Sequence, residues 1–368
     1  MNRLRLALVY AGLAVVLAAA PAAASSPFHT IATGLLNPRG LALGPNGRLY
    51  VAEAGVGAGT DSVEIGPTGR VIAILRPGKA HPWIHTIRTG ITSIGNQSGQ
   101  NTEGVDGISV DSNGIIWAIV GRSAKLAGSS DPQIGQLLRI QQNGVWTAAG
   151  NVGDRGYYFT KYHPGLDPGG QFPDSNPYGV LADGHRYVVD AGANTLDVVK
   201  ADGTVRVLAY FPNTQASDAI PTCVARGPDG ALYIGTLALV DSLFAGPPHP
   251  AATVYRVDPS QTDPNNFNTI TSVATVWAKG FWPIHGCTFG PDGSFWVSEI
   301  YTKVGPGGPG GGAIVRVPWN HPKDKSLRTT YGVGRLDAAG GIAVADDGTV
   351  YVSNRTTSTD GEVLRFHP

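Results

Sequence analysis

The stretch NPRGLALGPNGRLYVAEAG, residues 37–55, decides the fold because close variants of it occur five more times along the chain. Each copy has alternating apolar residues on both sides of a glycine, a pattern typical of paired β-strands. The glycine supplies the positive φ of a hairpin turn, and the Asn or Asp before it favours the same turn. The other copies are EGVDGISVDSNGIIWAIVG from residue 103, NPYGVLADGHRYVVDAG from 176, IPTCVARGPDGALYIGTL from 220, PIHGCTFGPDGSFWVSEI from 283 and AAGGIAVADDGTVYVSNR from 338.

A third strand follows every hairpin, and the spacing leaves room for a fourth. The third strands read GRVIAIL, GQLLRI, NTLDVV, ATVYRV, GAIVRV and GEVLRF. Six four-stranded units predict a six-bladed β-propeller, an all-β fold in which each sheet stacks on two neighbours. The last unit has no fourth strand, whereas residues 28–33 (FHTIAT) belong to no unit. We therefore expect this N-terminal strand to close the ring by pairing with residues 362–366.

The first 24 residues have the layout of a secretory signal peptide. Arg3 and Arg5 precede an apolar run over residues 6–20, and an alanine triplet that ends at Ala24 offers a cleavage site. We predict cleavage after Ala24, a propeller domain over residues 25–368, and a secreted, periplasmic or cell-envelope location. An uncleaved membrane anchor is the alternative, and no other stretch is apolar enough to span a bilayer.

Charge and loop lengths limit the class of partner. The chain carries 27 Lys plus Arg and 27 Asp plus Glu, so there is no net positive charge to attract nucleic acid or an anionic membrane. The longer loops all lie on one face of the predicted ring, which indicates the binding face. We expect a small molecule or another protein to bind there, at the mouth of the central channel.

The longest insertion, residues 151–175, joins units two and three on that face and is rich in tyrosine and phenylalanine. We expect it to cover the channel mouth. The alternative is an aromatic plug that only packs the channel.

The two cysteines, Cys223 and Cys287, lie in the inner strands of units four and five. When these units are aligned on their turn glycines, the cysteines are offset by one position, which places their side chains on opposite strand faces. A disulfide requires the two side chains to approach each other. We therefore favour two buried thiols, although an exported protein can form a disulfide.

Two sets of aligned positions are expected around the channel mouth, because inner strands begin and second strands end on that face. The starts of the inner strands carry Arg39, Asp106, Tyr178, Thr222, His285 and Gly340. The positions six residues past each turn glycine carry Glu53, Val120, Asp190, Thr236, Glu299 and Asn354. The candidate ligand-binding residues are Arg39, Glu53, Asp106, Tyr178, Asp190, His285, Glu299 and Asn354.

The chemistry of these side chains leaves several roles open. The carboxylates could hold a divalent cation such as Ca²⁺ or act as acid and base. We do not favour a bound cation, because in NHL-type repeats the acid of a YVxD motif bonds the following turn, and YVVD at residues 187–190 matches it. Arg39 and Asp106 could form a salt bridge, and His285 is either a base or ligand, or satisfies a local hydrogen bond.

Several segments resemble the ScyD/ScyE family of exported bacterial proteins. They are NPRGLALGPNGRLYVAEAG, GQLLRI, DSNPYGVLADGHRYVVDAGANTL, PTCVARGPDGALYIGTL and CTFGPDGSFWVSEI, and they cover most of residues 30–360. DSNPYG followed by VVDAG is the most specific part. The resemblance implies an exported NHL-like propeller whose biochemistry is poorly defined, and it implies no catalytic residues. We favour a ligand-binding or protein-interaction module.

Two groups of propeller enzymes give the alternative, a channel-mouth hydrolase or lyase. Gluconolactonase and senescence-marker-like hydrolases hold a divalent metal with Glu, Asn and Asp at the starts of inner strands. Here only Asp106 fits that set, and Arg39 would repel a cation. Strictosidine-synthase-like propellers need no metal and use an acid in the channel, a role that Glu299 or Glu53 could fill.

Overall fold

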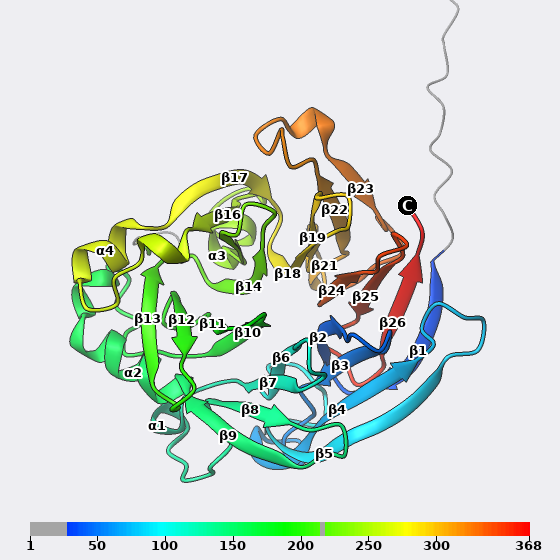
Figure 1. The fold of residues 1–368 in the computed structure, drawn as a ribbon, viewed down its shortest axis with the longest axis horizontal. Helices are drawn as coiled ribbons and strands as arrows, with labels where there is room; N and C mark the ends of the chain where they lie inside the picture. The colour runs from blue at the N-terminus through cyan, green and yellow to red at the C-terminus, as the bar shows by residue number, and fades with distance from the viewer. Residues whose placement is uncertain (1–27, 214–217) are drawn as a thin grey trace, which may run out of the picture.

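The computed structural model describes residues 28–213 and 218–368, which form a ring of six four-stranded antiparallel sheets (Figure 1). This is the predicted six-bladed β-propeller. The predicted signal peptide over residues 1–24 lies outside the described residues. Within the described ranges, no helix is both long and apolar enough to cross a membrane.

The strands of each blade follow one another outward from the channel. Blades one to three contain β2 (Pro38–Leu43), β3 (Leu49–Glu53), β4 (Glu64–Leu75), β5 (Trp83–Gly95); β6 (Val105–Val110), β7 (Ile116–Val120), β8 (Gln136–Ile140), β9 (Trp146–Asn151); and β10 (Pro177–Ala182), β11 (Arg186–Asp190), β12 (Thr195–Val199), β13 (Val205–Tyr210). Blades four to six contain β14 (Pro221–Arg226), β15 (Leu232–Thr236), β16 (Ala252–Val257), β17 (Thr275–Phe281); β18 (Ile284–Phe289), β19 (Phe295–Glu299), β22 (Ala313–Val317), β23 (Thr329–Tyr331); and β24 (Ile342–Val344), β25 (Val350–Asn354), β26 (Gly361–Phe366), β1 (His29–Leu35).

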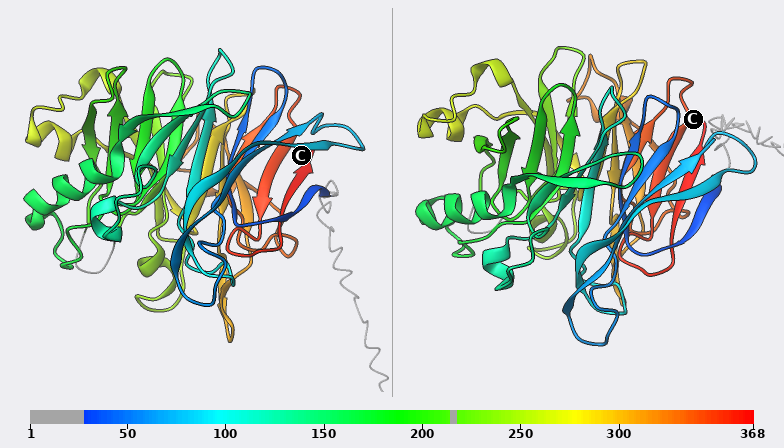
Figure 2. Two further views of the ribbon diagram at one scale, coloured as in Figure 1. Left: turned by 90° about the horizontal axis from the view of Figure 1, so that it is seen from below. Right: turned by 60° about the horizontal axis from the view of Figure 1, so that its bottom comes forward.

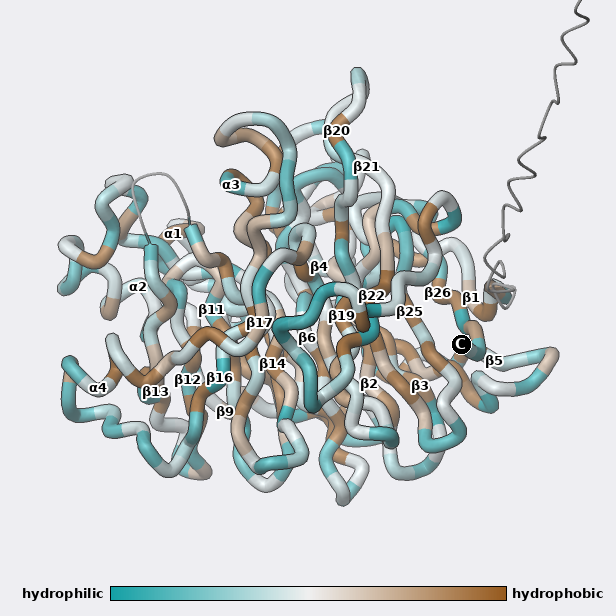
Figure 3. Tube along the Cα trace, turned by 90° about the horizontal axis from the view of Figure 1, so that it is seen from above, coloured by the Kyte–Doolittle hydropathy of each residue, from teal (hydrophilic) through white to brown (hydrophobic). Residues whose placement is uncertain are grey.

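The remaining elements lie in connections between these strands. They are α1 (Ala124–Ala127), α2 (Val152–Tyr162), α3 (Leu239–Leu243), α4 (Phe267–Ser272), the short 3-10 helices η1 (Pro164–Leu166), η2 (Pro259–Gln261), η3 (Lys325–Leu327), and the hairpin of β20 (Lys303–Gly305) and β21 (Gly308–Gly310). Figure 3 shows α3 and the β20–β21 hairpin rising from one face of the ring, whereas the opposite face carries mainly short turns. The expected asymmetry between the two faces is therefore present.

The repeated motif builds each hairpin and the core between blades. Gly230 has a φ of 78°, which a residue with a side chain rarely adopts, and Asp229 accepts hydrogen bonds from Ala231 and Tyr233. The aromatic residue three positions past the turn glycine points into the core: Tyr233 is fully buried and packs edge-on against Phe289 of the next blade. Adjacent blades are thus held together by apolar side chains supplied by the same motif.

The N-terminal strand closes the ring, as predicted. β1 pairs antiparallel with β26, with His29 opposite Arg365 and Leu35 opposite Gly361. Figures 1 and 2 show the first and last described strands side by side in the sixth blade. The ring of Phe28 lies 4.5 Å from that of Phe366, which extends the contact beyond the strand. Both ends of the described chain therefore contribute to one sheet.

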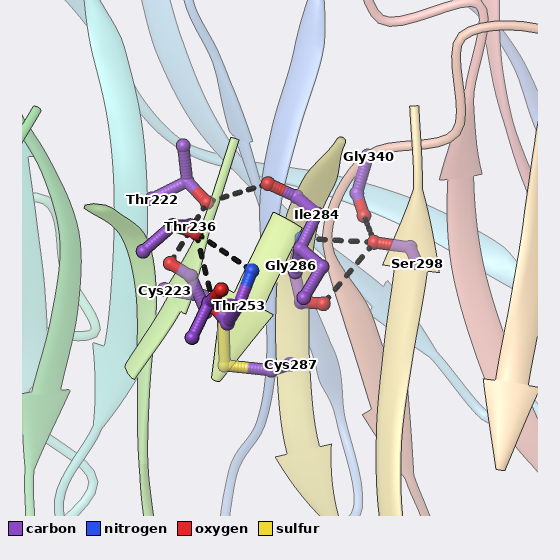
Figure 4. The surroundings of a disulfide bond; sticks show 10 residues. Thr222, Cys223, Thr236, Thr253, Ile284, Gly286, Cys287, Ser298 and Gly340 are labelled. Carbon is purple, nitrogen blue, oxygen red and sulfur yellow. Dashed lines mark hydrogen bonds between the residues drawn. A yellow bond between two sulfur atoms is a disulfide. The ribbon is translucent and has the colours of Figure 1, made fainter. Parts of the chain in front are cut away.

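The prediction of two buried thiols is wrong, because Cys223 and Cys287 form a disulfide (Figure 4). The cysteines lie on inner strands β14 and β18, and their Cα atoms are 5.7 Å apart. The predicted one-position offset does place the side chains on opposite faces of equivalent sheets. In a propeller, however, each blade turns one face to the next blade, which presents its opposite face in return. The offset therefore brings the two sulfur atoms together.

The prediction that residues 151–175 cover the channel mouth is also wrong, because their aromatic part packs at the outer side of blade three. Phe159 of α2 packs against Val207 and Tyr210 of β13 and against Ile270 of α4. The ring of His163 stacks 4.6 Å from that of Phe267. Figure 1 shows α2 at the periphery, away from the centre of the ring. The insertion forms a satellite core instead of a lid or a plug.

Candidate functional site

Inner strands from four blades bring polar side chains together around a cavity of about 60 Å³ in the central channel. The second residues of the inner strands β6, β10, β14 and β18 all line the cavity; they are Asp106, Tyr178, Thr222 and His285. Arg39 of β2 reaches the same cluster through Tyr178. The structure thus brings together four of the eight candidate residues: Arg39, Asp106, Tyr178 and His285.

A hydrogen-bond chain crosses this cluster from blade one to blade five. Arg39 Nη1 donates to the Tyr178 hydroxyl over 3.0 Å, and Arg39 Nη2 donates to the Thr102 carbonyl over 2.9 Å. The Tyr178 hydroxyl lies 2.5 Å from His285 Nε2. Because arginine can only donate, the hydroxyl accepts from Arg39 and donates its own hydrogen to Nε2. A neutral His285 then carries its hydrogen on Nδ1.

His285 is held in its neutral form. The side chain is 5% exposed, and burial, assisted by the charge of Arg39, lowers its pKa from 6.5 to about 3. Nδ1 is buried and has no hydrogen-bond partner among the described residues. A buried donor without a partner is costly, so this N–H is available for a ligand atom or a water molecule.

Asp106 forms with Arg39 the salt bridge that the sequence suggested, at a long separation. Its Oδ1 lies 3.8 Å from Arg39 Nε, and both atoms lack a hydrogen-bond partner in the described part of the chain. Burial raises the pKa of Asp106 to about 7, while the charge of Arg39 opposes that rise. The mouth therefore holds a carboxyl group that titrates near neutral pH, beside a fixed positive charge.

The second set of polar positions serves the blades themselves. Each of these side chains accepts a hydrogen bond from a backbone N–H just before the inner strand of its own blade. The pairs are Glu53 with Leu36 at 2.8 Å, Asp190 with Asn176 at 2.7 Å, Glu299 with Trp282 at 3.0 Å and Asn354 with Asp337 at 2.8 Å. In these four blades, the polar residue six positions past the turn glycine therefore holds the backbone that leads into the inner strand.

Two members of this set are saturated by neighbours. Glu53 also takes two bonds from Arg70, at 2.6 and 2.8 Å. Asp190 accepts from the Ser175 hydroxyl and from the N–H groups of Gly192 and Ala193, which matches the turn bonding expected for a YVxD motif. Its burial nevertheless raises its pKa to about 7.

The remaining aligned positions contribute little polar surface to the mouth. The Thr222 hydroxyl donates to the Ile284 carbonyl of the next blade, and the Thr236 hydroxyl donates to the Thr253 carbonyl (Figure 4). Val120 is buried and Gly340 has no side chain.

Tyr301 is a neighbour of the cluster that the sequence alignment misses. It lies close enough to raise the pKa values of both Arg39 and Tyr178. Tyr301 follows Glu299 by two residues and lies just beyond the last position that the aligned repeats share. The only signal for it in the sequence is an aromatic residue close to a candidate acid.

A divalent metal of the gluconolactonase type does not fit this cluster. Of the residues at the inner-strand starts, only Asp106 is a hard anionic ligand, and the Arg39 guanidinium lies beside it. Over residues 28–213 and 218–368, no group of three or more His, Cys, Asp or Glu side chains could hold a metal ion.

No protein-family model matches the sequence, and no curated protein matches it. Solved structures match over most of the chain. A Bacteroides thetaiotaomicron VPI-5482 protein of unknown function is 10% identical with a TM-score of 0.54, over 92% of this chain and 75% of that one. A gluconolactonase from Xanthomonas campestris is 10% identical with a TM-score of 0.51 (93% and 90% covered), and a luciferin-regenerating enzyme is 12% identical with a TM-score of 0.51 (93% and 95%). At these identities the similarity supports the β-propeller fold alone.

Proposed function

We propose that this chain is an exported β-propeller of the ScyD/ScyE type that binds a small polar ligand at its channel mouth. The observation that carries the proposal is the buried cluster of Arg39, Asp106, Tyr178 and His285, in which three polar atoms lack partners among the described residues. Buried polar groups are normally paired, so unpaired ones favour a bound polar group. The cavity of about 60 Å³ takes only the polar end of such a ligand, and the rest of the molecule extends outward into the channel mouth. The Cys223–Cys287 disulfide supports export, because such bonds persist mainly in oxidising compartments.

A channel-mouth hydrolase or lyase is the second candidate. The observation that favours it is the pKa of Asp106, about 7, because a general acid or base works best when its pKa lies near the working pH. His285 is a poor second acid or base for such a reaction, because its pKa of about 3 makes it a weak base. The binding proposal is preferred because only one group of the cluster is tuned for proton transfer.

A thermal-shift screen of the mature protein tests both candidates, with lactones, sugars and small carboxylic acids as the panel. A ligand of the folded state raises the melting temperature. Tyr178→Phe and His285→Gln should each weaken a ligand that binds at the mouth by about tenfold, since each removes one hydrogen-bonding group. Lys79→Ala and Asp202→Ala, at exposed positions on the opposite-face turns, are the controls.

The outcomes separate the candidates. Binding that depends on Tyr178 and His285, with no chemical change in the ligand, supports a binding protein. Turnover that disappears in Asp106→Asn supports the enzyme. If neither mouth variant weakens any ligand of the panel, the functional site lies elsewhere and the proposal is refuted.

Export has its own test. We expect the mature protein to begin at Ser25, directly after the alanine triplet of the predicted signal peptide. Intact-mass measurement of the protein produced in a bacterial host checks this. A chain that keeps Met1 and stays in the cytoplasm would contradict export.

A further inference from the structure

A second cleft lies between blades four and five, away from the channel cluster. Its volume of about 450 Å³ is in the range of small-molecule sites, roughly 300–1,000 Å³. Ala313 and Val315 of β22 form part of its wall, together with Phe281 at the end of β17 and the following Trp282. The buried acid beside this apolar part of the wall is Glu299.

Glu299 lacks the counter-ion that the equivalent residue of blade one possesses. Glu53 lies opposite Arg70 in the β3–β4 pairing and forms two bonds with it, whereas Glu299 lies opposite Ala313 in the β19–β22 pairing. Among the described residues, no Lys or Arg nitrogen lies within 4.0 Å of the Glu299 carboxylate, although that side chain is only 4% exposed. The repeat therefore leaves a buried carboxyl group beside a cleft, at the place where a cation stands in blade one.

Arg328 stands near Glu299 without pairing with it. The Arg328 guanidinium lies 4.0 Å from the centre of the Phe281 ring and is held there by bonds to the carbonyl groups of Lys279, Gly280 and Pro322. Its charge lowers the pKa of Glu299, although burial has the larger effect and raises that pKa to about 7. Glu299 and Arg328 both line the cleft, so a ligand in it meets both charges.

The charges around the cleft indicate which class of ligand would bind there. Lys325 lines the cleft together with Arg328, so one acid faces two bases. A simple cation would be drawn to the acid but repelled by the bases, and a simple anion would meet a buried carboxylate. A molecule that carries both charges at a short separation complements both sides.

We propose that this cleft binds a free α-amino acid with an apolar side chain. The ammonium group pairs with Glu299, and the carboxylate lies toward Lys325 and Arg328. The apolar side chain covers Trp282 and Val333, of which Val333 is 72% exposed without a ligand. This site is independent of the function proposed for the channel mouth.

Isothermal titration with L-leucine tests the proposal, and two partial analogues resolve the charges. 3-Methylbutylamine lacks the carboxylate of leucine, and 4-methylpentanoate lacks its ammonium group. We expect leucine to bind and each analogue to bind at least about tenfold more weakly, since each loses one charge pair. Comparable affinity for leucine and for either analogue would overturn the zwitterion assignment.

Matched variants of the chain place the ligand in the cleft. Ala313→Arg rebuilds the blade-one pair and should abolish leucine binding, because the new guanidinium neutralises Glu299 and fills the cleft. Glu299→Gln still accepts the Trp282 N–H bond through its amide oxygen but carries no charge, so it should weaken leucine at least about tenfold. Tyr178→Phe should leave leucine binding unchanged, which separates this site from the channel mouth.

Two results would overturn the proposal. One is an absence of leucine binding to the wild-type protein up to millimolar concentration. The other is leucine affinity that Glu299→Gln leaves intact, and this variant decides the matter if Ala313→Arg fails to fold.

Discussion

His285 and the buried carboxyl groups shift the stability of the folded state with pH in opposite directions. The folded-state pKa of His285 is about 3, below its ordinary 6.5, so between these values the unfolded chain binds the extra proton. Its contribution to stability is therefore lost as pH falls below 6.5. Asp106, Asp190 and Glu299 have folded-state pKa values of about 7, above the ordinary value of about 4. Between these two values the folded chain binds more protons than the unfolded chain. Their contribution is lost as pH rises toward 7.

We predict that the protein is more stable at pH 5 than at pH 7.5, because these three carboxyl groups, together with Asp197 and Asp218 whose pKa values are raised to about 6, outnumber one histidine. Asp106→Asn should flatten the decline of unfolding free energy over this range, and His285→Gln should steepen it. Urea unfolding at a series of pH values measures these slopes. If both variants follow the slope of the wild-type protein, neither group has the displaced pKa described above.

At the scale of single residues, the sequence predicts where a side chain lies in its blade better than it predicts the residues to which that side chain is hydrogen-bonded. Alignment on the turn glycines identified Arg39, Tyr178 and His285 as the starts of inner strands, and the structure places them there. It could not predict the chain of bonds that joins them, because Arg39 and Tyr178 are 139 residues apart and meet only when the ring is complete. The alignment also missed Tyr301, because it considered only the position six residues past each turn glycine.

At the scale of elements, the disulfide shows how a correct local rule gave a wrong conclusion. The period of a strand correctly placed Cys223 and Cys287 on opposite faces of equivalent sheets. What the period cannot supply is the stacking of one blade on the next, which turns those faces toward each other. The prediction that residues 151–175 cover the channel mouth was wrong for a related reason, because the residues that they pack against on β13 and α4 are distant in sequence.

We predict that the disulfide stabilises the junction between blades four and five. It closes a span of 64 residues, and its removal should cost about 3–4 kcal/mol of unfolding free energy. Denaturant unfolding of Cys223→Ala/Cys287→Ala measures the loss. Dithiothreitol should destabilise the wild-type protein and have no effect on the double variant. A reductant effect of equal size on both proteins would show that the bond does not carry the stability.

At the scale of the whole molecule, the fold was predictable because one motif encodes it six times. The number of blades and the strand that closes the ring followed from the repeats and from the one strand without a unit. The asymmetry between the two faces followed from loop lengths, whereas the assignment of the longer-looped face as the binding face stays a prediction. Which loop lies over the channel depends on packing between insertions, and no repeat records that.

We predict that removing residues 25–35 costs several kcal/mol and promotes aggregation. β26 would then expose a free edge, and Glu362 would lose the hydrogen bond from Thr30 while it keeps those from Arg335 and Asn354. Thermal unfolding and light scattering of the truncated protein measure the effect. A synthetic peptide of residues 28–35 should restore part of the stability. A truncated protein that melts like the parent would contradict closure by β1.

The pairing of β1 with β26 also sets the order in which the molecule can be finished. Thr30 and Glu362 are bonded across 332 positions of sequence, so β1, the first strand of the described residues, has no partner until β26 has been made. Every other blade can assemble from strands that are neighbours in time. The nascent protein therefore passes through a state of five complete blades with an open seam, and its aggregation hazard is concentrated in that interval.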